Sequence, residues 1–302
     1  MDREFLSRPI RYDAMCENLS QLARENPQIN VTSIGRSLLG REIPLVTLGR
    51  GRANFVYVGG VHAMEWHTCL ILLQLARELA VWEREDRFRY GMDPRFVLSG
   101  RRVCIIPMLN PDGVELVCGG INTAGVMAER LLKMNVRGDF SHWQANARGV
   151  DLNHNYNAGF DEYKALVADS EYAEPGPTRY HGEYPESEPE TQALCSFIRT
   201  LGGARMLMAL HTQGEEIYWD YNGYAPHPQL QAARVLARYS GYTVARPDGV
   251  ASYSGMKDWH LLEFGPLAFT LECGRGINPL PPSDTPYIYA RLRKMLFRSL
   301  II

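Results

Sequence analysis

A histidine and a glutamate near residue 60 form a pattern that suits a divalent metal ion. His62 and Glu65 follow the apolar run at residues 55–58 and the pair Gly59-Gly60. Catalytic zinc sites use two or three protein ligands held by rigid elements and leave one coordination position open. We therefore expect His62 and Glu65 to be metal ligands, although the HxxE spacing alone fits a structural histidine at a helix start equally well.

Three other residues bear on how such a site would be completed. His67 makes the local string H-x-x-E-x-H, which fits neither HExxH nor HxxEH, so we expect it to point elsewhere. His211 follows the apolar run MLMAL and would complete a site of two histidines and one glutamate. Glu272 follows the apolar run PLAFTL, where a carboxylate beside a metal ion could accept a proton from water. The alternative for Glu272 is a strand cap on the surface.

The elements that must position these residues alternate between strands and helices. Apolar or alternating runs predict strands at 55–58, 102–108, 206–210 and 266–271, and two more within 31–50 that are joined by a turn around Leu39-Gly40. Helical spacing predicts helices at 10–25, 68–85, 188–201, 229–239 and 286–300. This alternation predicts one α/β domain over residues 1–302, with a mixed, mostly parallel central sheet flanked by helices.

Polar residues follow several of the predicted strands. His62, Asn110, His211 and Glu272 all do so, and ligands in α/β sheets bind beyond the carboxyl ends of the strands. Elsewhere, the string LNPDG at 109–113 predicts a turn, residues 119–150 show little pattern, and residues 157–188 predict a long surface loop.

Composition and charge narrow the class of protein. The chain is 45% hydrophobic and 22% charged, with a net charge of −2, so we expect neither a nucleic-acid partner nor binding to an anionic membrane. Six scattered cysteines without a CxxC pair predict reduced thiols. The opening residues do not resemble a secretory signal, and the longest apolar stretch, 69–82, is too short and too often interrupted to span a bilayer. These features favour a cytoplasmic protein, and the oligomeric state stays open.

Taken in order, the motifs resemble the zinc carboxypeptidase family of the carboxypeptidase A type. The order is HxxE, NPDG, GVDLN, a strand that ends in histidine and a strand that ends in glutamate, supported by IGRSLLGR, YHGEYPESEPET and TLECG. The resemblance runs from about residue 10 to residue 300 and implies that fold. It also implies one zinc ion bound by His62, Glu65 and His211, with Glu272 as the general base and acid that activates a zinc-bound water.

The resemblance assigns roles to three further residues. Asp151 of GVDLN matches the carboxylate that orients the first ligand histidine. Arg148 matches the arginine that stabilises the oxyanion, although Ala147 could align there instead. Tyr253 matches the mobile tyrosine that contacts the substrate, with an ordinary packed tyrosine as the alternative.

Two departures from the family pattern concern the substrate. Asn153-His154 stands where exopeptidases of the family carry an Asn-Arg pair that grips the terminal carboxylate, and a largely neutral imidazole predicts a weaker grip. The alternative is that His154 packs beneath its loop. Lys257 stands where the family selects the side chain of the leaving residue, which favours a side chain that ends in a carboxylate, unless Lys257 is a solvated surface residue.

Within the family, LNHNYNAGF, LHTQGEEIYW, SGMKDW and ECGRGINPLP look like the bacterial γ-D-glutamyl-diamino acid peptidases. This branch implies hydrolysis of the γ-D-glutamyl–meso-diaminopimelate bond in peptidoglycan stem peptides, with a muropeptide as the partner. Two alternatives remain: a carboxypeptidase that acts on ordinary α-peptides, and a non-catalytic cell-wall-binding protein. The sequence leaves open whether cleavage is endo or exo and whether the substrate is intact wall or recycled fragments.

Overall fold

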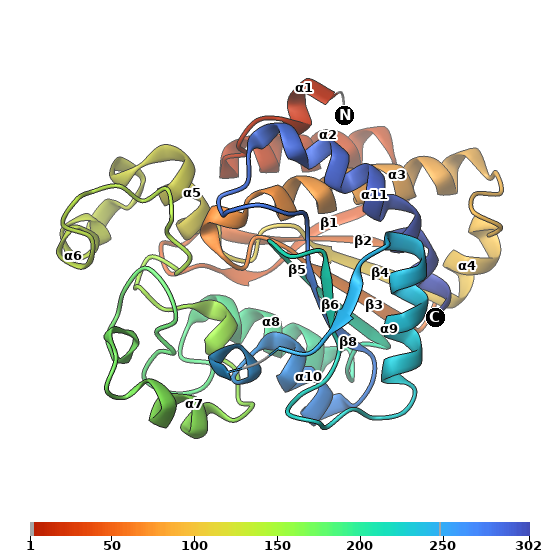
Figure 1. The fold of residues 1–302 in the computed structure, drawn as a ribbon. Coiled ribbons are helices and arrows are strands. Elements are labelled where there is room, and N and C mark those ends of the chain that lie inside the picture. The colour runs from red at the N-terminus through yellow and green to blue at the C-terminus, as the bar shows by residue number, and fades with distance from the viewer. Residues whose placement is uncertain (1–2, 248) are drawn as a thin grey trace.

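A mixed sheet with helices on both faces forms the centre of the molecule (Figure 1). The computed structural model describes residues 3–247 and 249–302. Within them the sheet has eight strands in the order β1-β2-β4-β3-β5-β8-β6-β7. Their bounds are β1 Asn30–Arg36, β2 Glu42–Leu48, β3 Ala53–Val58, β4 Arg101–Ile106, β5 Met206–His211, β6 Glu216–Tyr218, β7 Thr243–Ala245 and β8 Ala268–Glu272.

The middle of this sheet is parallel and its flanks are mixed. Strands β4, β3, β5 and β8 run parallel to one another, whereas β1, β2 and β4 pair antiparallel and β6 pairs antiparallel with β8. The prediction of a mixed, mostly parallel sheet flanked by helices is therefore confirmed. The carboxyl ends of β3, β5 and β8 meet at one edge, because parallel neighbours end on the same side.

The helices divide between the two faces of the sheet. Helices α2, α3 and α11 lie above the sheet in the view of Figure 1, and α8 and α10 lie below it. The α-helices in the described residues are α1 Arg3–Leu6, α2 Tyr12–Glu25, α3 His67–Glu85, α4 Pro94–Gly100, α5 Pro111–Gly119, α6 Ala128–Met134, α7 Phe160–Val167, α8 Pro189–Thr200, α9 Gln229–Ser240, α10 Met256–Phe264 and α11 Thr285–Arg298.

Alternation along the strands explains this layering. Phe55 and Tyr57 of β3 join the apolar cluster under α2, α3 and α11, whereas Val56 and Val58 join the cluster under α8 and α10. Successive side chains of a strand point to opposite faces, so a strand that is apolar throughout can be buried on both sides. The strands and the five helices predicted from the sequence agree with the observed bounds to within two residues or so at their ends.

Three segments differ from the sequence predictions. The LNPDG string begins a helix instead of forming a turn: Pro111 starts α5, and the Asn110 side chain accepts a hydrogen bond of 2.9 Å from Gly113 N as its N-cap. Helix α7 lies inside 157–188, where a loop was expected. Helix α6 lies in 119–150 and packs with Phe140 and Trp143 in a small separate apolar cluster.

The turn between β3 and α3 requires glycine. Gly60 has φ +59°, and a Cβ atom there would lie 2.7 Å from Cys69 Sγ and 3.1 Å from Met108 Cα. A larger residue would meet both steric strain and backbone atoms that cannot move aside. Gly60 therefore allows the chain to leave β3 sharply and to bring the next residues back over the strand ends.

Two further observations concern the described part of the chain. Its six cysteines are all free thiols, as the scattered spacing predicted. Its helices include none with the length and apolar character needed to cross a bilayer.

Candidate active site

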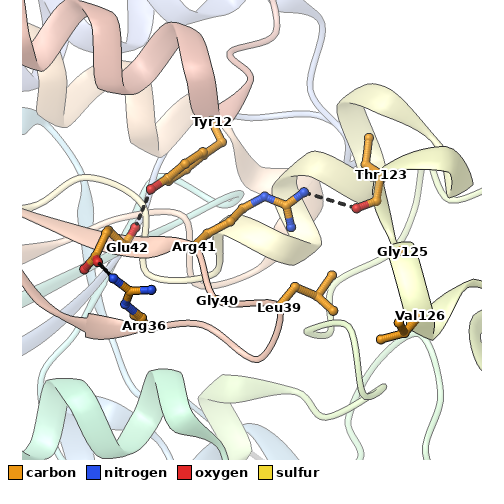
Figure 2. Close-up of a pocket in the computed structure, with 9 residues that line it drawn as sticks. All are labelled: Tyr12, Arg36, Leu39, Gly40, Arg41, Glu42, Thr123, Gly125 and Val126. Atoms are coloured by element: carbon orange, nitrogen blue, oxygen red, sulfur yellow. Dashed lines mark hydrogen bonds and ion pairs between the residues drawn. The ribbon is translucent and has the colours of Figure 1, made fainter.

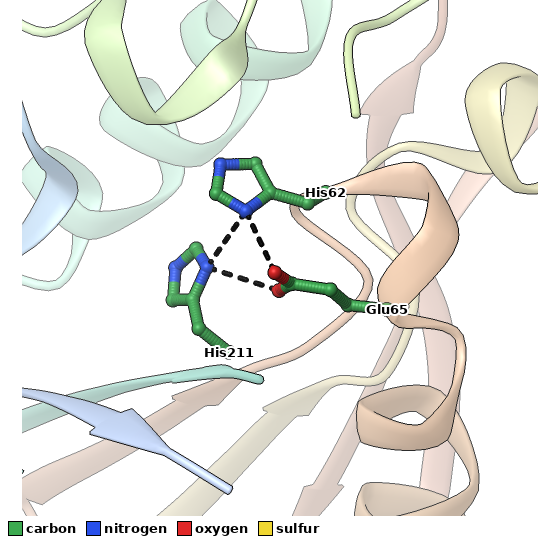
Figure 3. A group of neighbouring side chains, drawn as sticks. All are labelled: His62, Glu65 and His211. Carbon is green, nitrogen blue, oxygen red and sulfur yellow. Dashed lines mark hydrogen bonds and ion pairs between the residues drawn. The ribbon is translucent and has the colours of Figure 1, made fainter. Parts of the chain in front are cut away.

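Three side chains from distant parts of the chain converge at the carboxyl ends of β3 and β5 (Figure 3). His62 lies just after β3, Glu65 lies in the 3₁₀ turn Ala63–Glu65, and His211 is the last residue of β5. His62 Nδ1 is 3.1 Å from Glu65 Oε1 and 3.2 Å from His211 Nδ1, and Glu65 Oε2 is 3.2 Å from His211 Nδ1. The sequence predicted these three residues as ligands, and the fold brings them together.

The donor set and its spacing fit a zinc ion. Zinc binds histidine nitrogen and carboxylate oxygen at about 2.0–2.1 Å in a tetrahedron, whose ligand atoms are then about 3.3–3.4 Å apart. The observed separations are close to that value. Glu65 is buried between His62 and His211, and the contact of its Oε2 with His211 Nδ1 lacks hydrogen-bond geometry, so a cation bound there would compensate the buried carboxylate.

Asp151 lies on the far side of the His62 ring. Its Oδ1 is 3.1 Å from His62 Nε2, and it also accepts hydrogen bonds from Asn153 N at 3.0 Å and Arg179 N at 2.9 Å. Burial alone would raise the pKa of Asp151, but His62 and these donors outweigh burial and lower the pKa below its usual range. An ionised Asp151 holds a proton on His62 Nε2 and leaves Nδ1 directed at Glu65 and His211.

Glu272 ends β8 beside the histidine that ends β5. His211 and Glu272 are register partners in the parallel pairing of these strands, and both line the same cavity. Burial, together with the neighbouring Glu65 carboxylate, raises the pKa of Glu272 well above its usual value. A carboxyl group whose pKa is raised in this way is suited to accept and donate a proton in turn.

The cavity that contains these groups has a volume of about 200 Å³. In the described residues its lining comprises His62, Glu65, Gln144, Asp151, Asn153, His154, Arg179, His211, Thr212, Tyr218, Pro247, Ala251, Gly255, Lys257, Asp258, Thr270 and Glu272. Most residues that the sequence singled out are among them. His67 is not: it is buried elsewhere and contacts Thr285 Oγ1 at 2.8 Å and the Leu280 carbonyl at 2.9 Å, as expected for a residue that points away.

Two predicted residues lie outside the lining. Arg148 places its Nη1 3.6 Å from Glu188 Oε1, because the loop directs this side chain toward the start of α8. The structure thus offers no support for Arg148 as the group that stabilises the oxyanion. Tyr253 packs its ring against Tyr221 at 6.4 Å between centroids, and its carbonyl oxygen lies 3.1 Å from His154 Nδ1.

The Asn153-His154 pair lines the cavity without a positive charge. His154 stacks on Tyr163 with 4.2 Å between ring centroids, and burial lowers its pKa, so the ring is neutral at pH 7. Asn153 Oδ1 accepts a hydrogen bond of 3.3 Å from Met256 N at the start of α10. His154 therefore both packs under its loop and reaches the cavity, so the two interpretations drawn from the sequence are compatible.

Lys257 is buried and already paired. Its Nζ donates to Asp258 Oδ1 and to the Asp220 carbonyl, and only 3% of the residue is exposed. The alternative of a solvated surface lysine is therefore wrong. Asp258 also lines the cavity, so this side of the site presents an ion pair with no net charge.

Arg179 and Gln144 line the cavity although the sequence did not indicate them. Both lie in segments for which little structure or a surface loop was predicted. Neither belongs to a spacing pattern that points to chemistry. Their place follows from loops that return to the sheet edge, which residue spacing alone does not reveal.

A larger hollow of about 610 Å³ lies at another place on the surface (Figure 2). It lies between the turn that joins β1 to β2 and residues 123–126. Its charged groups are engaged: Arg36 pairs with Glu42, and Arg41 binds Asp112 and the Thr123 carbonyl. No cluster of ligands or proton-transfer groups is found there in the described residues, so the chemistry belongs to the smaller cavity.

Two sequence comparisons identify proteins related to this chain. A family model described as zinc carboxypeptidase matches residues 15–290. The gamma-D-glutamyl-L-diamino acid endopeptidase 1 of Lysinibacillus sphaericus is 32% identical over 279 residues, which cover 92% of this chain and 69% of that protein.

Solved structures share the fold at low sequence identity. Carboxypeptidase A from Helicoverpa armigera superposes with a TM-score of 0.76 and 19% identity, over 97% of this chain and 73% of that chain. The murein-tripeptide amidase MpaA from Escherichia coli O157 superposes with a TM-score of 0.53 and 21% identity, over 88% of this chain and 91% of that chain.

Proposed function

This chain belongs to the zinc carboxypeptidase family and is a zinc metallopeptidase, and we propose that it hydrolyses the γ-D-glutamyl–meso-diaminopimelate bond of peptidoglycan stem peptides. The assignment of this substrate depends mainly on the buried Lys257–Asp258 ion pair, which lies in the same cavity as His62, Glu65 and His211. The side chain of meso-diaminopimelate ends in an ammonium and a carboxylate on one carbon. A paired cation and anion complement such a zwitterion, whereas a single charge would match only half of it.

The catalytic roles follow from the positions of the side chains. His62, Glu65 and His211 would hold the zinc ion, and Asp151 would fix the ring of His62. Zinc supplies a Lewis acid that polarises the scissile carbonyl and acidifies water. Glu272 accepts the proton of the attacking water and delivers it to the leaving amine nitrogen, which requires the carboxylate form first and the acid form second.

The neutral His154 favours a substrate whose leaving residue continues into a further amide. A guanidinium at this position would bind a free main-chain carboxylate through two parallel hydrogen bonds. An uncharged, buried imidazole makes no such ion pair, so loss of the carboxylate costs less. We therefore propose endo-cleavage as well as release of a terminal diamino acid. A relative named as a gamma-D-glutamyl-L-diamino acid endopeptidase supports this proposal.

Mass spectrometry of muropeptide digests tests the substrate directly. The zinc-loaded protein is incubated with L-Ala-γ-D-Glu-meso-diaminopimelate, with the same peptide ending in L-lysine, and with an ordinary α-linked peptide. We expect cleavage between glutamate and diaminopimelate, with lower efficiency on the lysine peptide. Release of a C-terminal residue from the α-linked peptide alone would establish an ordinary carboxypeptidase. A purified protein that retains no zinc and cleaves none of the three would revive the binding protein.

Lys257 has its own test within the same assay. Lys257→Ala should reduce the preference for diaminopimelate over lysine, because the carboxylate of the zwitterion loses its cation. Equal efficiency on both peptides in the wild type, unchanged in the variant, would remove Lys257 from substrate selection. Arg137→Gln serves as a control, because Arg137 is an exposed cation outside the cavity lining.

A further inference from the structure

Arg179 reaches the cavity from a loop that is fixed against the metal ligands. Its backbone N donates to Asp151 Oδ2 at 2.9 Å, and Asp151 Oδ1 in turn lies 3.1 Å from His62 Nε2. The backbone of Arg179 has φ +63°, a left-handed conformation that residues other than glycine rarely adopt. The local structure therefore imposes this backbone conformation at Arg179, which is exposed and lines the same cavity as Glu272.

The guanidinium of Arg179 is oriented but not neutralised. Its Nη1 donates to Tyr172 Oη at 3.0 Å, and the group lies over the Tyr172 ring at 4.9 Å from the centroid. Within residues 3–247 and 249–302 it forms no ion pair. The other cationic side chain of the lining, Lys257, is paired with Asp258, so Arg179 supplies the uncompensated cation among the described lining residues.

A γ-glutamyl substrate carries an anion that suits this cation. When glutamate forms its peptide bond through the side-chain carboxyl group, its α-carboxylate stays free. That carboxylate is separated from the scissile carbonyl by only a short aliphatic chain, on the side opposite to the leaving amine. An α-linked residue without an acidic side chain has no such group, because its α-carboxyl carbon is itself the scissile carbonyl. An α-linked glutamate does keep a carboxylate at the same separation, but its amino nitrogen is on the carbon next to the scissile carbonyl.

We propose that Arg179 binds the free α-carboxylate of the γ-linked D-glutamyl residue and so selects substrates that carry a carboxylate at this position, an inference that rests on the proposed function. The planar guanidinium offers several N–H donors in an arrangement that matches a carboxylate, and one of them already anchors it to Tyr172. Lys257 and Arg179 then act on different residues of the substrate: Lys257 on the leaving diamino acid and Arg179 on the acyl side.

Two peptides that differ only at this carboxylate test the proposal. One is L-Ala-γ-D-Glu-meso-diaminopimelate, and the other has the α-carboxylate of D-glutamate converted to a carboxamide. The wild type should prefer the carboxylate peptide by about 10- to 100-fold in kcat/KM, the range expected for hydrogen bonds to a charged group. Arg179→Gln should abolish this preference by slowing only the carboxylate peptide, and Arg179→Lys should keep part of it.

Binding without turnover gives a second readout. In the Glu272→Gln background, calorimetric titration should show the same preference between the two peptides, and Arg179→Gln should remove it. Arg137→Gln is the matched control, because it deletes an exposed arginine outside the cavity lining and should keep the preference. Far-UV circular dichroism and the unfolding midpoint verify that each variant is folded.

The outcomes separate this inference from the proposed function. If the wild type cleaves the γ-D-glutamyl bond in both peptides, but the preference is absent or survives Arg179→Gln, the role of Arg179 is refuted and the proposed function stands. If the zinc-loaded wild type cleaves neither peptide, the proposed function fails and the assignment of the Arg179 ligand fails with it.

Discussion

Replacing Asp151 by asparagine exchanges one carboxylate oxygen for an NH₂ group in the side chain that contacts the His62 ring. Asp151 accepts from two backbone N–H groups, those of Asn153 and Arg179, and faces His62 Nε2. An asparagine has one oxygen and one NH₂ group at these positions. In one orientation its NH₂ meets Arg179 N–H, and in the other it meets both His62 Nε2 and Asn153 N–H. Each orientation sets a donor against a donor, and neither supplies a negative charge.

The cost to metal binding follows from these contacts. A hydrogen bond to a charged group contributes about 1.5–3 kcal/mol, and partners of metal-binding histidines commonly account for about 10- to 100-fold in metal affinity. If the NH₂ group faces His62, the ring also shifts toward the tautomer that has its proton on Nδ1, the atom directed at Glu65. We therefore expect Asp151→Asn to weaken zinc binding by about 10- to 100-fold.

Competition with a chromophoric chelator measures this change on folded protein. Asp112→Asn is the matched control: Asp112 is equally buried and binds Arg41 and the Leu39 backbone N–H, away from the cavity. The control should lose stability and keep its affinity for zinc. An Asp151→Asn protein that is folded and binds zinc as tightly as the wild type would refute the reasoning about His62.

Three other substitutions probe different parts of the same molecule. Glu272→Gln should keep its zinc and lose about 10²- to 10⁴-fold in kcat, the range typical of a general base, so turnover at the wild-type rate would exclude Glu272 from proton transfer. Lys257→Met leaves Asp258 buried without its cation and should cost about 3–5 kcal/mol in urea unfolding at pH 7, whereas the double variant Lys257→Met/Asp258→Leu should recover most of that loss; equal losses in both variants would contradict the pairing argument. Burial raises the pKa of Glu190 to about 7, so the native state keeps a proton that the unfolded chain releases. The stability that comes from this bound proton is complete below the usual pKa of glutamate and is lost as the pH rises to about 7. The lost stability amounts to about 3 kcal/mol. In denaturant titrations at pH 5 and pH 8, Glu190→Gln should lack this loss, and the same change in stability in the wild type and the variant would disprove the role of Glu190.

The two histidines proposed as metal ligands could be placed together from the sequence because each is near the end of an apolar run. The runs at 55–58 in β3 and 206–210 in β5 are apolar throughout, His211 ends β5, and parallel strands bring their carboxyl ends to one edge. Glu272 ends a third buried strand, β8. A residue at the end of a buried strand is therefore placed by the sheet itself, and little depends on the loops between the strands.

The residues proposed to contact substrate depend on loops, and their positions follow less directly from the sequence. Arg148 stood next to a recognisable motif, but its loop directs it to Glu188, whereas Arg179 had no motif and reaches the cavity. The side chain of Lys257 was judged by its type, yet its charge is cancelled by its own neighbour Asp258. Loop backbones and ion pairs depend on contacts between segments far apart in the chain, which have no periodic signature.

The pairing of β5 with β8 fixes His211 and Glu272 relative to each other for as long as the central sheet stays folded. His211 and Glu272 occupy the same level of adjacent parallel strands, and Cys273 N donates to the His211 carbonyl at 2.7 Å. A slip of one residue between these strands would turn Glu272 to the opposite face, since side chains alternate along a strand. Heat inactivation should therefore coincide with cooperative melting of the sheet, without an earlier phase in which a loosened site loses activity while the fold persists.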